Sequence, residues 1–389
     1  MISQRANRIK SFMAMDVMER AMALEKKGQE IIHLEIGEPD FETPLCIKEA
    51  AQKALVEGKT GYTHSLGIIE LREAIAEFYL EKYGVSISPE QILITSGTSQ
   101  AMLMVYGALV SAGDEVIMSN PHYPCYPNFV QYYEGIPKYI NVYEEDGFQY
   151  RLEDVKTCIG EKTKAMVINS PSNPTGHVLS AELIESLAEL PLLLISDEIY
   201  HGLVYEGKEH SVLEYTGKSF VFNGFSKLYA MTGWRLGYLI APREYIRTLQ
   251  VMHQNFMISA NAFVQWAGLA ALQYAQADVA AMVLEYNRRR RFMLKRLKEI
   301  GFGVRKEPVG AFYILANARS FTSNSYNFAF ELLENAGVAV TPGIDFGSNA
   351  EGYLRFTYAN SLERIAKAMD RLEVYLNERS KGRCSDLER

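Results

Sequence analysis

Short apolar segments alternate along the chain with segments in which apolar residues recur at helical spacing. That spacing at 13–27 and at 68–83 predicts two helices, and Gly84 ends the second. Apolar runs bounded by turn or helix signals predict strands at QILITSG (91–97), EVIMS (115–119), KAMVINS (164–170), LLLISDE (192–198) and SFVFNG (219–224). Strands that alternate with helices predict an α/β fold with a mostly parallel sheet flanked by helices.

The pattern changes near residue 277. A long helical segment closed by Gly301 precedes GAFYILA, NFAFELLENAG, VAVTPG and YLRFTYA, and an amphipathic segment follows at 361–378. These segments predict a second, smaller α+β domain. We therefore expect an N-terminal segment (1–45) that packs with the small domain or a partner subunit, a large domain (46–277) and a small domain (278–389).

Composition narrows the classes of function. Of the 389 residues, 48% are hydrophobic and 22% are charged, as in ordinary globular proteins. A net charge of −7 gives no general attraction to nucleic acid, and no apolar run reaches bilayer length, so we expect neither as a partner. Four widely spaced cysteines predict reduced thiols in a cytoplasmic protein and no metal site. The RRRR run at 288–291 is predicted to lie on a solvated helix face.

The candidate chemistry begins with Lys227, which stands between an apolar strand and a Gly/Trp-rich strand in SFVFNGFSKLYAMTGWRLGY. A desolvated lysine loses its proton more readily and becomes a nucleophile toward carbonyls. Pyridoxal 5'-phosphate supplies such a carbonyl. We therefore expect a Schiff-base enzyme, which also needs an anion cradle, a carboxylate for the pyridine nitrogen and a cationic clamp for a substrate carboxylate.

The turn SGTSQA (96–101) is the candidate anion cradle. Gly97, Thr98 and Ser99 stand where a strand turns into a helix, so backbone N–H groups and hydroxyls can converge on a phosphate. The alternative is that Ser96 or Thr98 only caps the helix. The location at a strand's carboxyl end favours a ligand site.

Asp197 closes LLLISD and is the candidate partner of the ring nitrogen, with Tyr200 three residues later as a donor to a ring oxygen. The alternative is that Asp197 or Glu198 caps a following helix. Asn173, in the turn SPSNPTG, can offer its amide to the ring oxygen and to a substrate carboxylate, although asparagine is common in any turn.

Tyr123 in NPHYPCYPN can stack on an aromatic ring, or it can belong to a surface aromatic cluster. Arg235 in TGWRLGY is placed in a strand-like setting where a guanidinium can hold a phosphate. Arg355 in YLRFTYA can clamp an α-carboxylate. For either arginine a structural ion pair is the alternative.

Taken in order, SGTSQA, SPSNPTG, SDEIY, FSK with MTGWRLGY, and LRFTYA resemble the class I/II aminotransferases, pyridoxal-phosphate enzymes of fold type I in the aspartate aminotransferase superfamily. The resemblance covers essentially the whole chain, including GEPDF at 37–41 and GYTHSLG at 61–67. It implies a seven-stranded type of sheet. It also implies two-stage (ping-pong) transfer of an amino group from an L-amino acid to a 2-oxo acid through a Lys227 Schiff base.

The resemblance also implies residue roles. Lys227 is the Schiff-base lysine and proton shuttle, Asp197 is the pyridinium partner, and Gly37 and Arg355 bind the substrate. The remaining cofactor contacts are implied for Gly97, Thr98, Ser99, Tyr123, Asn173, Tyr200, Ser226 and Arg235. Tyr62 matches a tyrosine that reaches the phosphate of the neighbouring subunit, which implies a homodimer with shared active sites.

Two departures limit the transfer of these roles. Gly224 stands where many members carry a hydroxyl that touches the phosphate, so one hydrogen bond is absent or is supplied by water. Some aspartate-preferring relatives carry a lysine at the position of Ser99, which disfavours dicarboxylate specificity by that route here. The alternative on the same scaffold is β-elimination, as in a carbon–sulfur lyase. A cofactor-sensing regulator needs a DNA-binding module, and the motifs that begin by residue 37 leave no room for one.

Overall fold

The structure is a computed structural model that describes residues 2–387, with side chains described through residue 381. Within that range the thiols of Cys46, Cys125 and Cys158 are free, as predicted. The prediction for Cys384 falls on a side chain outside the described set. No group of histidine, cysteine, aspartate and glutamate side chains in the described part of the chain is arranged to hold a metal ion.

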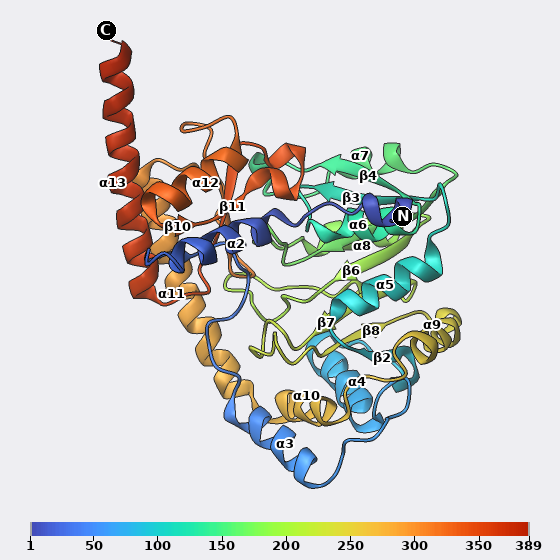
Figure 1. Ribbon diagram of the computed structural model, residues 1–389. Helices are drawn as coiled ribbons and strands as arrows, with labels where there is room; N and C mark the ends of the chain where they lie inside the picture. Colours follow the sequence, from blue (N-terminus) through green and yellow to red (C-terminus); the bar gives the residue numbers. More distant parts are fainter. Residues whose placement is uncertain (1, 388–389) are drawn as a thin grey trace.

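A seven-stranded sheet forms the centre of the larger body (Figure 1). In spatial order its strands are β2 (Ile92–Thr95), β8 (Gly237–Ile240), β7 (Ser219–Gly224), β6 (Leu193–Asp197), β5 (Thr163–Asn169), β3 (Glu115–Asn120) and β4 (Ile136–Asn141). Only β8 runs antiparallel to its neighbours; the other pairs are parallel. The predicted mostly parallel, seven-stranded sheet is confirmed.

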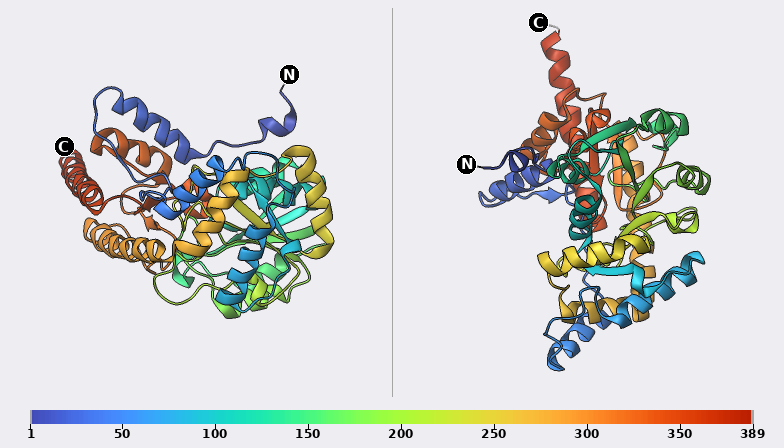
Figure 2. Two further views of the ribbon diagram at one scale, coloured as in Figure 1. Left: turned by 90° about the horizontal axis from the view of Figure 1, so that it is seen from below. Right: turned by 90° about the vertical axis from the view of Figure 1, so that its right-hand side faces the viewer.

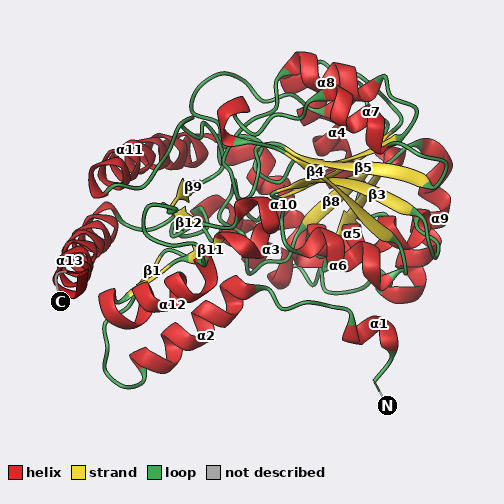
Figure 3. Ribbon diagram, turned by 90° about the horizontal axis from the view of Figure 1, so that it is seen from above, coloured by secondary structure: helices red, strands yellow, loops and turns green. Residues whose placement is uncertain are grey.

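Both faces of this sheet are buried. Alternate residues of β5 show this: Met166 and Ile168 enter one core, whereas Ala165 and Val167 enter the other. Helices α7 and α8 cover one face and α5 and α6 the other (Figure 3). The helices of this body are α3 (Leu45–Val56), α4 (Ile69–Tyr83), α5 (Thr98–Leu109), α6 (Cys125–Tyr132), α7 (Leu152–Cys158), α8 (Ala181–Ala188), α9 (Arg243–Phe256) and α10 (Ala262–Tyr274).

The second body follows α11 (Gln276–Ile300). Its three-stranded antiparallel sheet has the order β11 (Thr341–Pro342), β12 (Tyr353–Thr357), β9 (Tyr313–Asn317). It also contains β10 (Val338–Ala339), the helices α12 (Ser325–Ala336) and α13 (Leu362–Leu387), and the short helices η4 (Gly343–Phe346) and η5 (Ser348–Ala350). The last helix continues beyond the predicted end at residue 378 and projects from the body in Figure 1.

The N-terminal segment joins the two bodies. It contains α1 (Gln4–Asn7), α2 (Met13–Glu25) and β1 (Ile32–His33), and β1 pairs with β10. Val17 and Leu24 of α2 pack against Leu333 of α12. The residues before α2 lie against the larger body (Figure 2). There the Lys10 backbone exchanges hydrogen bonds of 3.1 and 3.2 Å with the Asn128 side chain. The division at residues 45 and 277 stays a prediction.

The structure corrects the prediction for the arginine run on α11. Arg288 and Arg291 are exposed, but Arg289 and Arg290 are buried. Arg289 donates to Asp40 at 2.6 Å, and Arg290 donates to the Pro308 carbonyl at 2.7 Å and forms an ion pair with Glu206. Glu285 and Asn287 on α11 are local partners of these two arginines. The other partners come from segments distant in sequence, so the local pattern alone does not reveal the burial.

In the part of the chain that the structure describes, no single helix is both long and apolar enough to cross a membrane. Helices α10 and α11 reach that length and apolarity only together, and they are bent by 76° at the break between them.

Candidate active site

A cavity of about 170 Å³ lies where β5 and β6 end, facing the second body. It collects residues from both bodies and from the N-terminal segment. Of the residues predicted from the sequence, those that line it are Gly37, Thr98, Ser99, Tyr123, Asn173, Asp197, Tyr200, Lys227 and Arg355. Gly97, Ser226, Arg235 and Tyr62 do not line it.

Lys227 lies just beyond the end of β7, and its Nζ donates to the Gly37 carbonyl at 2.6 Å. Burial lowers the pKa of Lys227 to about 8. The Glu38 and Asp197 carboxylates oppose this shift, whereas the guanidinium groups of Arg355 and Arg235 add to it. The amine is therefore much easier to deprotonate than a surface lysine, as the apolar flanking sequence predicts.

Asp197 ends β6 with a side chain that is only 4% exposed. The Tyr126 hydroxyl donates to it at 2.6 Å and the Ile199 backbone N–H at 3.3 Å. Burial nevertheless raises the pKa of Asp197 to about 6. Residues 199–202 form turns and not a helix, so Asp197 caps no helix, but its bond from the Ile199 N–H serves the next turn as the alternative predicted.

Arg355, from the middle strand β12, enters the cavity without a carboxylate partner. It is 1% exposed, and its guanidinium donates to Asn173 Oδ1 at 2.8 Å, to Thr341 Oγ1 at 3.1 Å and to the Glu35 carbonyl. Its Nε has no partner within the described structure, and no carboxylate of residues 2–381 lies within ion-pair distance. The structural ion pair considered for Arg355 is absent from those residues, so the charge is free to meet an anion.

The candidate phosphate end lies at the start of α5. Gly97 is the N-cap residue with φ of 85°, and no side chain caps the helix, so the capping alternative for Ser96 or Thr98 is wrong. A Cβ on Gly97 would lie 2.5 Å from Arg235 Nη2. Arg235 itself has φ of 53° and precedes β8, which corrects the strand-like setting predicted for it. Backbone N–H groups at a helix start and a guanidinium thus face the same space.

Four further residues predicted from the sequence are Tyr200, Tyr123, Ser226 and Tyr62. The Tyr200 hydroxyl bonds the Tyr313 hydroxyl at 2.8 Å. Tyr123 lines the cavity and meets Phe12 edge-on at 6.0 Å, so it is also part of an aromatic cluster. Ser226 is buried beside Lys227. Tyr62 is 84% exposed and does not line the cavity.

Several cavity residues were missed from the sequence. Tyr126 follows Tyr123 at helical spacing and Asn169 ends a predicted strand, so a local signal existed for both. Tyr313 leaves no local signal because its contacts with Tyr200 and with the Arg355 guanidinium, 4.4 Å from its ring, are tertiary. The N-terminal segment adds Phe12, Ala14 and Met15.

The chain belongs to the class I and II aminotransferases, whose family description matches residues 29–372. It is 43% identical to the (5-formylfuran-3-yl)methyl phosphate transaminase of Methanocaldococcus jannaschii, over 97% of this chain and 100% of that one. It is 39% identical to the aspartate aminotransferase of Pyrococcus horikoshii, over 96% and 97% of the two chains.

Solved structures agree. The aspartate aminotransferase of Thermus thermophilus with maleate superposes with a TM-score of 0.92 at 38% identity, covering 96% of this chain and 99% of that one. A Methanococcus jannaschii protein, described as similar in its active site to kynurenine aminotransferases, gives 0.91 at 43% identity over 97% and 100% of the two chains. This chain is a pyridoxal-phosphate-dependent aminotransferase of fold type I, and the lyase alternative is not favoured.

The residues present fit that cofactor. Among the described residues, a buried carboxylate with no cation in contact and an amine of lowered pKa line one cavity, together with Thr98 at the start of α5, where the neighbouring Gly97 makes room for the Arg235 guanidinium. They suit, respectively, a ring nitrogen, an aldehyde and a phosphate.

Proposed function

We propose that this enzyme transfers the amino group of an L-amino acid to a 2-oxo acid in two half-reactions, with Lys227 as the proton carrier. The observation that carries the proposal is the convergence of the Lys227 amine, the Asp197 carboxylate and the unpaired Arg355 guanidinium on one cavity. Pyridoxal phosphate, when bound, supplies the reactive aldehyde and an electron-withdrawing ring.

In this proposal each part of the cofactor has a partner in the chain. Asp197 would hold a proton on the ring nitrogen, and the Tyr126 hydroxyl, which donates to Asp197, would fix the carboxylate for that task. Tyr123 would stack on the ring, and Asn173 and Tyr200 would bond the ring oxygen. The phosphate would be held by Gly97, Thr98, Ser99, Ser226 and Arg235.

Lys227 moves the proton. A general base works best when its pKa is near the working pH, and burial brings the pKa of Lys227 to about 8. We infer that Nζ takes the proton from the substrate's α-carbon and gives it up again within the same half-reaction. The Gly37 carbonyl, 2.6 Å from Nζ, holds the amine in place between the two events.

Arg355 binds the α-carboxylate of the substrate. Its three acceptors are all uncharged, so an incoming carboxylate is the first anion that it meets. The Asn173 amide, held at 2.8 Å from Arg355, adds a donor on the same side.

We further propose that the amino donor carries an uncharged side chain. Lys227 and Arg355 are the only basic residues among the described residues lining the cavity. In this proposal Lys227 serves the cofactor and the α-proton and Arg355 binds the α-carboxylate, so neither is left for a charged side chain of the donor. Ser99 offers no positive charge, and Glu35 adds a carboxylic side chain to the lining. Phe12, Met15 and Ile36 provide apolar surface instead. The named activities of the relatives include aspartate and aromatic amino acids, so this choice needs its own test.

The homodimer with shared active sites remains part of the proposal. Tyr62 is 84% exposed, and the exposed apolar residues Val56, Phe256 and Met257 lie in the neighbouring segments. Thr63 is joined to Ser259 by a hydrogen bond of 3.3 Å, which puts these two segments side by side. A second subunit packed on this surface would cover the exposed apolar residues. It would also bring Tyr62 toward the cofactor phosphate bound by that second subunit. The cytoplasmic location also stays a prediction.

The test measures single half-reactions of the cofactor-loaded protein with a panel of L-amino acids, followed by the return half-reaction with pyruvate or 2-oxoglutarate. We expect each accepted donor to release its 2-oxo acid stoichiometrically, with aromatic or aliphatic donors preferred over aspartate and glutamate. Faster reaction of aspartate would refute the donor class alone. Release of ammonia together with a 2-oxo acid, in the absence of an acceptor, would refute the transfer itself.

A further inference from the structure

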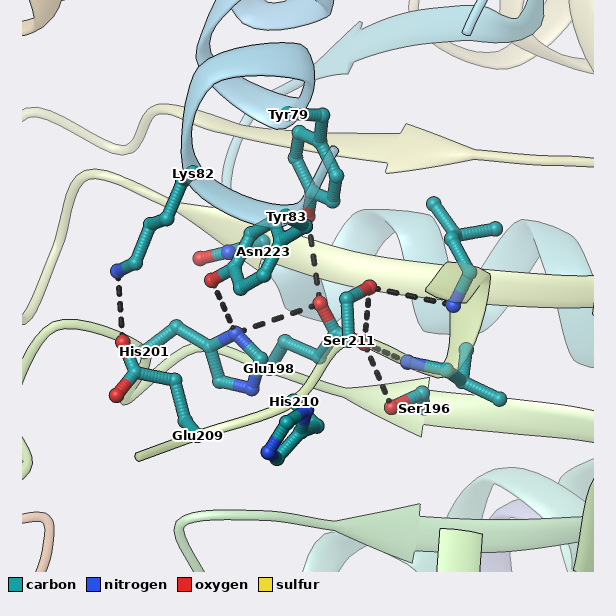
Figure 4. A network of polar contacts seen from close by, with 12 residues as sticks. Tyr79, Lys82, Tyr83, Ser196, Glu198, His201, Glu209, His210, Ser211 and Asn223 are labelled. Atoms are coloured by element: carbon teal, nitrogen blue, oxygen red, sulfur yellow. Dashed lines mark hydrogen bonds and ion pairs between the residues drawn. The ribbon is translucent and has the colours of Figure 1, made fainter. Parts of the chain in front are cut away.

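A buried polar cluster lies at the end of β6 (Figure 4). Successive strand residues point to opposite faces, so Asp197 faces the cavity while Ser196 and Glu198 face away from it. The cluster joins the end of β6 to α4 and to the short helix η3 (Val212–Glu214). No proposed cofactor or substrate contact uses it.

Glu198 is the centre of this cluster. Its side chain is only 1% exposed. Oε1 accepts hydrogen bonds from the Ser211 hydroxyl at 2.9 Å, the Val212 backbone N–H at 3.0 Å and the Ser196 hydroxyl at 3.1 Å. The Tyr79 hydroxyl lies 3.4 Å from Oε2. Each of these donors is uncharged.

No lysine or arginine of the described residues contacts this carboxyl group. Lys82 is close but pairs with Glu209 at 2.7 Å. His201 Nδ1 lies 3.6 Å from Oε2 and bonds the Tyr83 hydroxyl at 2.6 Å. Burial raises the pKa of Glu198 to about 8 and lowers that of His201 to about 3, so burial favours the uncharged form of both side chains. The titratable groups around Glu198 are Tyr79, Lys82 and Tyr83 of α4, His201, Glu209, His210 and Glu214 of the following loop, and Tyr238 of β8.

The position of Glu198 links this cluster to the cavity. It stands between Asp197 and Tyr200, and its backbone N–H donates to the Phe222 carbonyl at 2.8 Å while its own carbonyl accepts from His201 at 2.9 Å. The side chain therefore anchors the middle of the segment that carries both cavity residues. An uncharged anchor also avoids a second negative charge beside Asp197, which would make that carboxylate harder to ionise.

We propose that Glu198, through the three hydrogen bonds that Oε1 accepts, is a positioning residue that holds Asp197 and Tyr200 against the cofactor through the segment 197–201. The proposal rests on the roles proposed above for Asp197 and Tyr200. In this proposal the three hydrogen bonds at Oε1 do more than stabilise the fold. They fix the position and orientation of the end of β6, which carries Asp197, the proposed partner of the ring nitrogen.

The test compares Glu198→Gln with Glu198→Leu in the cofactor-loaded protein. The amide oxygen of glutamine can accept the same three bonds, whereas leucine leaves the Ser196, Ser211 and Val212 donors without an acceptor. Glu209→Gln is the matched control, because it alters another buried carboxylate of the cluster that is outside the segment 197–201. The readouts are the dissociation constant for pyridoxal phosphate, the pH midpoint of the bound cofactor's visible absorbance and the melting temperature.

We expect Glu198→Gln to keep the affinity and the absorbance midpoint, and Glu198→Leu to weaken cofactor binding about 10- to 100-fold and to move the midpoint. Glu209→Gln should lower the melting temperature alone. If Glu198→Leu does not fold, Glu198→Asp, which withdraws the carboxyl group by one methylene, should give the same changes in affinity and midpoint.

Three results would overturn the proposal. Glutamine behaving like leucine would mean that the ionised carboxylate is needed. A lower melting temperature with unchanged affinity and midpoint in Glu198→Leu or Glu198→Asp would mean that the cluster is only structural. Equal effects from Glu209→Gln would mean that any change in the cluster suffices. Asp197→Asn tests separately the role proposed for Asp197 as the partner of the ring nitrogen. If this variant leaves the absorbance midpoint unchanged, that role fails whatever the Glu198 variants show.

Discussion

The Lys227 amine and the Gly37 carbonyl oxygen are 2.6 Å apart, although 190 residues separate them in the chain. This hydrogen bond joins the end of β7 to the segment that leads from β1 into the larger body. A Cβ on Gly37 would lie 1.7 Å from the Tyr313 hydroxyl, so the glycine also makes room for the residue that bonds Tyr200. One backbone position thus supports two candidate catalytic side chains.

Gly37→Ala should therefore lower the catalytic rate more than it lowers the stability of the fold. The added methyl group must displace the Tyr313 ring or the segment that carries the Gly37 carbonyl, and a misplacement of about 1 Å can cost about 100-fold in rate. We expect kcat to fall by about that factor while pyridoxal phosphate still binds. Gly217→Ala is the control, since nothing lies within 4 Å of its added Cβ, and it should leave kcat unchanged. Normal kcat in Gly37→Ala would show that this packing is irrelevant to turnover.

Replacing Lys227 by methionine should stabilise the cofactor-free protein near pH 7 while abolishing activity. The pKa of Lys227 falls from 10.5 to about 8, which corresponds to about 3 kcal/mol of destabilisation when the amine is charged, against about 1 kcal/mol for the lost Gly37 bond. Between pH 8 and 10.5 the unfolded chain binds more protons than the folded one, so the wild type gains stability as the pH rises. Denaturant unfolding at several pH values should show the advantage of Lys227→Met shrinking across that window. A constant difference would contradict the lowered pKa.

Arg355→Lys should weaken substrate binding without unfolding the protein. Lysine keeps the charge but loses the planar fork that holds a carboxylate at two points, and we expect kcat/KM to fall by at least about 30-fold. Arg290→Lys is the matched control, because Arg290 is equally buried but pairs with Glu206 outside the cavity. It should lower the melting temperature and leave KM unchanged. Similar kinetics for both variants would argue against Arg355 as the carboxylate clamp.

Gly224→Ser tests whether the hydroxyl found in many relatives can be restored. A Cβ at this position would lie 2.8 Å from the Gly237 Cα on the neighbouring strand, so β7 and β8 must separate. We expect a loss of about 1–3 kcal/mol in unfolding free energy and no gain in cofactor affinity. Gly217→Ser, with nothing within 4 Å of its Cβ, should cost little. Tighter cofactor binding by Gly224→Ser would show that the strands accommodate the side chain.

The sequence was most informative where function depends on local pattern. Asp197 and Asn173 were found because polar residues stand just after apolar strands, and Lys227 because its neighbours are apolar. Tyr313 and Phe12 were missed because only tertiary packing brings β9 and the N-terminal segment to the cavity. The edge strand β4 was missed because Ile136 and Tyr139 remain exposed, which weakens the apolar pattern. The burial of Arg289 and Arg290 does not follow from the local pattern, because Asp40 and Glu206, which pair with them, are distant in sequence.

The central claim is that Lys227 moves the substrate's α-proton, and exchange of that proton tests it most directly. An α-deuterated L-amino acid is mixed with cofactor-loaded wild type or with Lys227→Ala in ordinary water, and loss of deuterium from the α-carbon is followed by NMR. We predict rapid loss with the wild type and none above background with Lys227→Ala, even where that variant binds both cofactor and amino acid. Loss at the wild-type rate in Lys227→Ala would contradict the account.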